Sequence, residues 1–186
     1  MITRTLLSLL LAFQTPIMGT GHRSVLLHGI QGPFTPGTAV GWTNFNNAKA
    51  CDGAYATAVV HEGAVGPSLS STNFGFSIPS TAVIAGISVS VLHLDITGNA
   101  QIQDNTVRLI KGGVGSGNNK ASAALWSGTV PETFNYGSAT DLWGLAWSPS
   151  DINASNFGVQ VNVKNTDLVD GDSTVGIDCV RITVAY

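Results

Sequence analysis

Apolar residues that alternate with polar ones recur in short segments along this chain, and this pattern constrains its fold more than any other feature. The segment 156–164 reads NFGVQVNVK and the C-terminal segment 180–186 reads VRITVAY. Because successive side chains of a β-strand point to opposite faces, both segments predict strands with one buried face. On these buried faces we expect Val159, Val161, Ile182 and Val184. No amphipathic helical pattern of ordinary length occurs from residue 40 onward.

Turn-forming residues separate the alternating segments and indicate the class of fold. The chain has 186 residues, with 22 glycines, 7 prolines and only 10% charged residues, and its length suits one domain. About eight short strands at this spacing predict an all-β protein, built as an antiparallel β-sandwich or barrel. The long irregular connections between the strands favour a β-sandwich of jelly-roll type.

One segment contains two phases of alternation. Residues 83–96 read VIAGISVSVLHLDI, where the apolar side chains from Ala85 to Val91 take odd positions and those from Leu92 to Ile96 take even ones. A change of phase within a strand predicts a bulge, or a bend between two sheets. The four histidines have no ligand-like spacing, and we expect each at the surface or in the N-terminal region: His22, His28, His61 and His93.

The first 39 residues differ in character from the rest of the chain. Residues 1–13 read MITRTLLSLLLAF, in which an arginine precedes a short apolar run, and this pattern is similar to a secretory signal. The run is too short to span a bilayer, and we expect it to be retained as an extended arm. Residues 14–39 contain three prolines and no sustained period, which predicts a connector. We therefore assign residues 1–39 to the arm and connector and residues 40–186 to the sandwich.

The apolar side chains of the arm require a surface on which to be buried. We expect that surface to belong to a partner, and packing against the chain's own sandwich is the alternative. The candidate partner-binding residues are Leu6, Leu7, Leu9, Leu10, Leu11 and Phe13.

Charge and cysteine content narrow the classes of partner. A net charge of -3 and eight scattered Lys and Arg residues provide no extended positive field, which disfavours nucleic-acid binding. So low a charge density is typical of a surface that other subunits cover in part, and we expect a homo-oligomer or a larger assembly. Cys51 and Cys179 can form a disulfide if the first and last strands lie side by side, and stay free thiols if they do not.

No catalytic or cofactor-binding motif is recognisable in the sequence. The segment 113–117 (GVGSG) places its serine one position too late for a nucleophile elbow. Two alternatives stay open, of which the first is calcium bound by Asp167, Asp170 and Asp172, although a solvated turn explains these residues equally well. The second is a carboxylate pair for glycoside hydrolysis, drawn from Glu62, Asp95, Asp104, Glu132 and Asp141. We expect no catalytic residue, no metal ligand and no cofactor.

Five segments form an ordered set: GWTNFNNAKACDGAYATAVV (41–60), FGFSIPSTAVIAGISVSV (74–91), VRLIKGGVGSGNNKA (107–121), TDLWGLAWSPSDINASNFGV (140–159) and IDCVRITVAY (177–186). This set resembles a β-sandwich domain that recurs in virion proteins encoded by tailed bacteriophages and prophages. The resemblance covers residues 40–186 and does not extend to the arm. It implies a structural role in a phage particle.

From this resemblance we expect a capsid decoration or cement protein without enzymatic activity, attached through its sandwich and arm. The expected partners are the major capsid protein or other virion proteins, with no nucleic acid and no membrane, and the expected location is the virion, assembled in the cytoplasm of the bacterial host. One alternative is a carbohydrate- or receptor-binding module of a tail or fibre, and another is a secreted bacterial β-sandwich protein. The former requires a row of exposed aromatic rings, whereas we expect the tryptophans in the core: Trp42, Trp126, Trp143 and Trp147.

Overall fold

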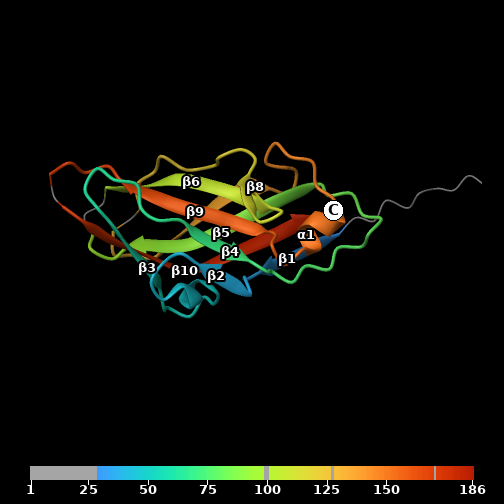
Figure 1. Ribbon diagram of the computed structural model, residues 1–186, viewed down its shortest axis with the longest axis horizontal. Helices are drawn as coiled ribbons and strands as arrows, with labels where there is room; N and C mark the ends of the chain where they lie inside the picture. The colour runs from blue at the N-terminus through green and yellow to red at the C-terminus, as the bar shows by residue number, and fades with distance from the viewer. Residues whose placement is uncertain (1–28, 99–100, 127, 170) are drawn as a thin grey trace, which may run out of the picture.

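The computed structural model describes residues 29–98, 101–126, 128–169 and 171–186 (Figure 1). Within these residues no helix is long and apolar enough to cross a membrane. The elements, in chain order, are β1 (Ile30–Phe34), β2 (Thr38–Val40), η1 (Phe45–Ala48), β3 (Ala56–Val60), β4 (Leu69–Thr72), β5 (Gly86–Asp95), β6 (Ile102–Lys111), β7 (Val114–Ser116), β8 (Glu132–Ser138), α1 (Pro149–Asn153), β9 (Gly158–Asn165) and β10 (Ser173–Ala185).

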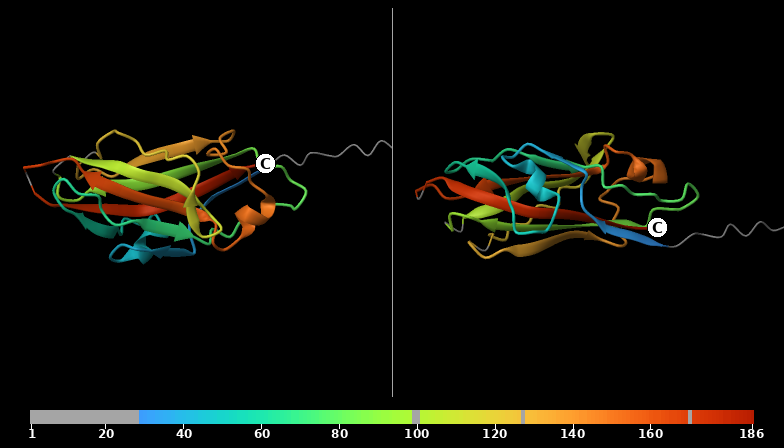
Figure 2. Two further views of the ribbon diagram at one scale, coloured as in Figure 1. Left: turned by 45° about the horizontal axis from the view of Figure 1, so that its top comes forward. Right: turned by 90° about the horizontal axis from the view of Figure 1, so that it is seen from below.

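Two antiparallel sheets form the molecule and lie face to face, as Figure 2 shows. The first sheet has the strand order β1-β10-β5-β8, and β3 pairs with the first part of β10. The second has the order β2-β4-β9-β6-β7. The four-strand orders β1-β10-β5-β8 and β4-β9-β6-β7 are those of a jelly roll, in which two Greek keys are interleaved. The predicted all-β jelly-roll sandwich is confirmed, with β2 and β3 as additional strands.

The core lies between the sheets and is filled by the alternate residues that the sequence pattern indicated. Val159 and Val161 of β9 and Ile182 and Val184 of β10 are buried, which confirms the predicted phase of both strands. The largest fully buried side chains include those of Trp126, Trp143 and Phe157. Burial of this apolar surface is the main contribution that stabilises such a sandwich.

The expected domain boundary at residue 40 is wrong, because the sheets begin earlier. β1 pairs with the end of β10 through Ile30↔Ala185 and Gln31↔Val184, and β2 pairs with β4. Pro33 suggested a connector, but an edge strand tolerates proline because one side of its backbone needs no hydrogen-bonding partner. The sandwich therefore includes the described residues from Gly29 onward.

The predicted change of phase in β5 is also wrong. His93 and Asp95 continue the inward face of Val91, and all three are buried. The bulge lies in the neighbouring strand β10, between Ile177 and Cys179. Leu94 faces the other way and is nevertheless buried, because it lies over Gly176, where a Cβ atom would be only 3.0 Å from the leucine side chain. Both faces at this end of β5 are covered, so the pattern of apolar residues does not show which face points into the core.

Candidate functional site: the groove beside β8

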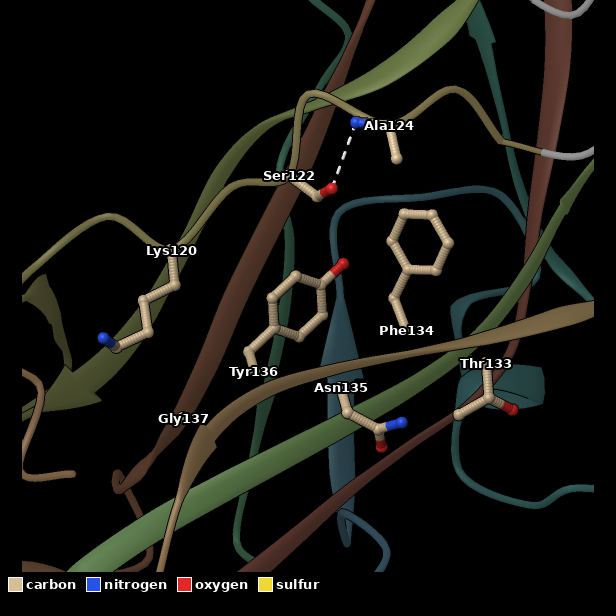
Figure 3. Close-up of a pocket in the computed structure, with 8 residues that line it drawn as sticks. All are labelled: Lys120, Ser122, Ala124, Thr133, Phe134, Asn135, Tyr136 and Gly137. Carbon is tan, nitrogen blue, oxygen red and sulfur yellow. Dashed lines mark hydrogen bonds between the residues drawn. The ribbon is translucent and has the colours of Figure 1, made fainter. Parts of the chain in front are cut away.

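A groove of about 480 Å³ opens on the side of the sandwich where the two sheets part (Figure 3). One wall consists of five consecutive residues of β8, 133–137, and the other of Lys120, Ser122 and Ala124. Figure 3 shows Phe134 and Tyr136 on one side of β8 and Thr133 and Asn135 on the other. Because the groove touches residues on both sides of the strand, it follows the strand's edge rather than one of its faces.

The second wall is an extended segment that lies against the edge of β6. The Lys120 N–H donates to the Val107 carbonyl at 2.9 Å, and the Trp126 N–H donates to the Ile102 carbonyl at 2.9 Å. Next to Lys120, the Asn119 side chain takes the place of a backbone acceptor, since its oxygen accepts from the Val107 N–H at 2.8 Å. Alternate residues of this segment consequently point into the groove, as in a strand.

A buried carboxylate beneath the groove joins the two sheets. Asp104 of β6 accepts hydrogen bonds from the Tyr136 hydroxyl at 2.7 Å, the Trp126 indole at 3.1 Å and the Ser122 N–H at 2.9 Å. Burial raises the pKa of Asp104, and these three hydrogen bonds act in the opposite direction. Burial and the neighbouring carboxylate of Asp104 raise the pKa of Tyr136, so its hydroxyl keeps its proton. The group therefore acts as a polar cross-link between β6 and β8.

His93 lies within this same region and is fully buried, so the expected surface position is wrong. Its ring stacks on Trp126 with centroids 3.9 Å apart and meets the edge of Phe134 at 4.5 Å. Among the described residues neither ring nitrogen has a hydrogen-bond partner. Burial lowers the pKa of His93 to about 3, which keeps the imidazole neutral at neutral pH.

One end of the groove holds an ion pair. The Lys120 ammonium pairs with Asp141 at 2.6 Å and lies 5.4 Å from the centre of the Trp143 ring. Partial desolvation acts to raise the pKa of Asp141, but hydrogen bonds from Lys120 and the Trp143 backbone lower it overall. Gly137 leaves room for Trp143, because a Cβ atom there would lie 2.6 Å from the indole nitrogen.

The two cysteines are joined by a disulfide, with their Cα atoms 5.0 Å apart and 128 positions apart in the sequence. The bond connects the loop before β3 to the middle of β10. In the same loop the N–H groups of Asp52 and Gly53 both donate to the Asp178 carboxylate at 3.1 Å. This loop is thus held to the central strand of the first sheet by covalent and polar contacts.

The other candidate residues are dispersed. The arm residues Leu6 to Phe13 lie outside the described residues, as do His22, His28 and Asp170. Asp172 pairs with the exposed His61 at 2.8 Å. In the part of the chain that the structure describes, no group of three or more His, Cys, Asp or Glu side chains could hold a metal ion. Three tryptophans are buried and the fourth packs against the core, so the expectation for these residues is confirmed: Trp42, Trp126, Trp143 and Trp147.

Comparison with protein-family models, curated proteins and solved structures finds no match for this chain. The carboxylate of Asp104 and the phenol of Tyr136 are bonded to each other beneath the surface, whereas the groove itself exposes a strand edge and part of the Phe134 ring. Such a surface suits an extended polypeptide, which can add hydrogen bonds to the edge.

The sequence pattern does not predict the groove. The segment TFNYG (133–137) shows a brief alternation around Phe134 and Tyr136, and this was the available signal. The opposite wall, residues 120–124, reads KASAA and has no pattern that predicts a position beside β8.

Proposed function

We propose that this chain is a structural, non-enzymatic component of a tailed-phage particle, a decoration or cement protein attached through its arm and sandwich. The observation that carries the proposal is the junction between the arm and the sandwich. Gly29 and Tyr186 exchange backbone hydrogen bonds, and the Tyr186 N–H donates to the Gly29 carbonyl at 2.9 Å. A Cβ atom at Gly29 would lie 2.7 Å from the Tyr186 ring, so the chain enters the sandwich in close contact with its last residue.

This junction suits a protein that is anchored by its N-terminal residues. β1 follows directly and is bonded to β10, which also pairs with β3 and β5 and carries the disulfide. A pull on the arm would therefore act on the strand that has the most partners in the first sheet. The leucine-rich residues 6–13 supply apolar surface for the attachment, as the hydrophobic effect requires.

The polar interior supports a structural role as well. Asp104 and Tyr136 are directed at each other across the sheets, and the His93 imidazole is enclosed by aromatic rings. A general acid or base has to reach a substrate atom within hydrogen-bonding distance. These groups are instead used to hold the sheets together.

Deletion of residues 1–28, which keeps Gly29 and β1, tests the proposal. We expect the truncated chain to remain folded by circular dichroism and to lose most of its co-sedimentation with undecorated phage shells. The matched control is the full chain with Thr38→Lys, an exposed substitution on β2, which should co-sediment normally. If the truncated chain binds shells as tightly as the full chain, the arm is not the attachment and the proposal fails.

One observation favours a second candidate, the secreted β-sandwich protein. Disulfides persist in oxidising compartments and are rare in the cytosol, and the Cys51–Cys179 bond would form readily after export. Residues 1–13 would then be a signal that is removed. The N-terminal sequence of the protein isolated from its native source distinguishes the candidates, since a retained arm begins at Met1. The carbohydrate-binding alternative has no comparable support, because the four tryptophans do not form an exposed row.

A further inference from the structure

The groove follows the one long sheet edge, among the described strands, that has none of the usual protection against pairing. Natural proteins block such edges by making strands short, or by placing proline or several charges in them. β2 and β7, at the edges of the second sheet, have three residues each, and β1 contains Pro33. The edge of β3 is partly covered by the Thr43↔Thr57 bridge. β8 has seven residues, no proline and a single charge at Glu132.

Hydrogen bonds at the end of β5 show which way its backbone groups point. The Ile96 N–H donates to Thr174, on the β10 side, at 2.8 Å, and the Asp95 N–H donates to Gly128 at 2.9 Å. Backbone groups of successive residues point alternately to the two neighbours of an antiparallel strand. The odd-numbered residues of β5 therefore face β8.

The same alternation fixes the direction of the groups on β8. Val89 of β5 is opposite Tyr136, so the even-numbered residues of β8 bond to β5. The N–H and C=O groups of the odd-numbered residues Thr133 and Asn135 point away from β5, toward the open edge. Their side chains are exposed as well, so this edge is accessible to another strand.

We propose that two copies of this chain pair through β8, antiparallel, about a two-fold axis at Asn135. Asn135 is the central residue of β8 (Glu132–Ser138), so the register that uses the whole strand places it opposite Asn135 of the second copy. The outward N–H and C=O groups of the two asparagines then bond to each other reciprocally. Such an interface is isologous, because both copies use the same surface, and it joins the two first sheets into one.

Side chains in this register are complementary. Phe134 lies opposite Tyr136 of the second copy, so this pairing brings no charged side chains opposite each other. Glu132 of the second copy lies opposite Ser138, at the end of the groove where Lys120 is found (Figure 3). Glu132 of each strand thus approaches the Lys120–Asp141 ion pair of the other copy, where the lysine ammonium has N–H donors beyond the one it gives to Asp141, and the two Glu132 side chains are kept far apart. This charge complementarity favours a second copy over an unrelated strand.

The pairing is independent of the arm and goes beyond the proposed attachment to a particle. It predicts that the chain is a dimer in solution and that removal of residues 1–28 leaves the dimer intact. Sedimentation equilibrium of the full and truncated chains, in the absence of shells, measures both. If the truncated chain is monomeric at concentrations where the full chain is dimeric, the arm causes association and the β8 pairing is refuted, whereas the proposed attachment stands.

Charge substitutions at the axis provide the decisive test, because residue 135 meets its own copy. We expect Asn135→Lys and Asn135→Asp each to weaken the dimer by about fivefold or more, since like charges directly opposite each other on paired strands repel. An equimolar mixture of the two variants should restore association, because lysine then lies opposite aspartate. Thr38→Lys, at an exposed position of the edge strand β2, is the matched control and should leave the dimer unchanged.

A cross-linking experiment measures the register directly. Directly opposed residues have Cα atoms about 5.5 Å apart at a hydrogen-bonded position, within the range of a disulfide. Asn135→Cys should form an intermolecular disulfide under mild oxidation, and Thr38→Cys should not. The proposal is overturned if the full chain is monomeric, if the two charge variants behave like Thr38→Lys, or if Asn135→Cys cross-links no better than Thr38→Cys.

Discussion

His93 makes the stability of this sandwich sensitive to acid. The imidazole is buried between Trp126 and Phe134, and burial lowers its pKa from 6.5 to about 3. In the unfolded chain the ordinary pKa of 6.5 applies, so the unfolded state takes up a proton at a higher pH than the native state. Native stability is therefore lost as the pH falls below 6.5, and the loss continues to about pH 3.

The size of the effect follows from the difference between the two pKa values. Each pH unit between them costs about 1.4 kcal/mol, so lowering the pH from 6.5 to 4 should remove about 3 kcal/mol from the free energy of unfolding. A typical domain has a total stability of about 5–15 kcal/mol, and the expected loss is a large part of it. Replacing His93 by a residue that does not titrate should abolish this contribution.

Urea unfolding at pH 7 and at pH 4 measures the contribution in the wild type, His93→Phe and His93→Gln. Phenylalanine keeps an aromatic ring between Trp126 and Phe134, and glutamine keeps a polar group. Carboxylates also titrate over this range, so the quantity of interest is the wild-type loss of stability minus the variant loss. We expect this difference to be about 3 kcal/mol for both variants. Equal pH dependence in the wild type and both His93 variants would refute the reasoning.

Two further predictions concern the contacts that join distant parts of the fold. Tyr136→Phe removes one of the three hydrogen bonds to Asp104 and should lower the free energy of unfolding by about 1–3 kcal/mol. When Tyr136→Phe is combined with Asp104→Asn, the loss of stability should be smaller than the sum of the two single losses. Additive losses in this double-mutant cycle would contradict a shared contact. Replacing Cys51 and Cys179 together by alanine removes a cross-link between residues 128 positions apart and should lower the free energy of unfolding by up to about 4–5 kcal/mol. The melting temperature, measured by scanning calorimetry, should therefore fall by about 10 °C or more. An unchanged melting temperature would show that the loop is held by its other contacts.

Local patterns determined the class of this fold. Alternation with a period of two depends on neighbouring residues alone, so it predicted the buried faces of β9 and β10 from Val159, Val161, Ile182 and Val184. The same principle predicted a sandwich in place of a helical protein. Where both faces of a strand are covered, as at His93 and Leu94, alternation does not indicate which face is turned inward, and the prediction for His93 was wrong.

Contacts between distant segments were decided only by the tertiary structure. The sequence predicts a connector at β1, because the strand character of β1 depends on backbone pairing with β10, some 150 positions away, and not on its own side chains. The groove depends on two segments that are distant in the pattern of strands: 133–137 belongs to the edge strand β8 of the first sheet, and 120–124 lies against β6 of the second. Asp104 gained its partners Tyr136 and Trp126 in the same way. The pattern of a strand indicates which of its faces is buried, but it does not indicate which strand lies beside it. The neighbours of a strand depend on all the strand pairings of the two sheets together.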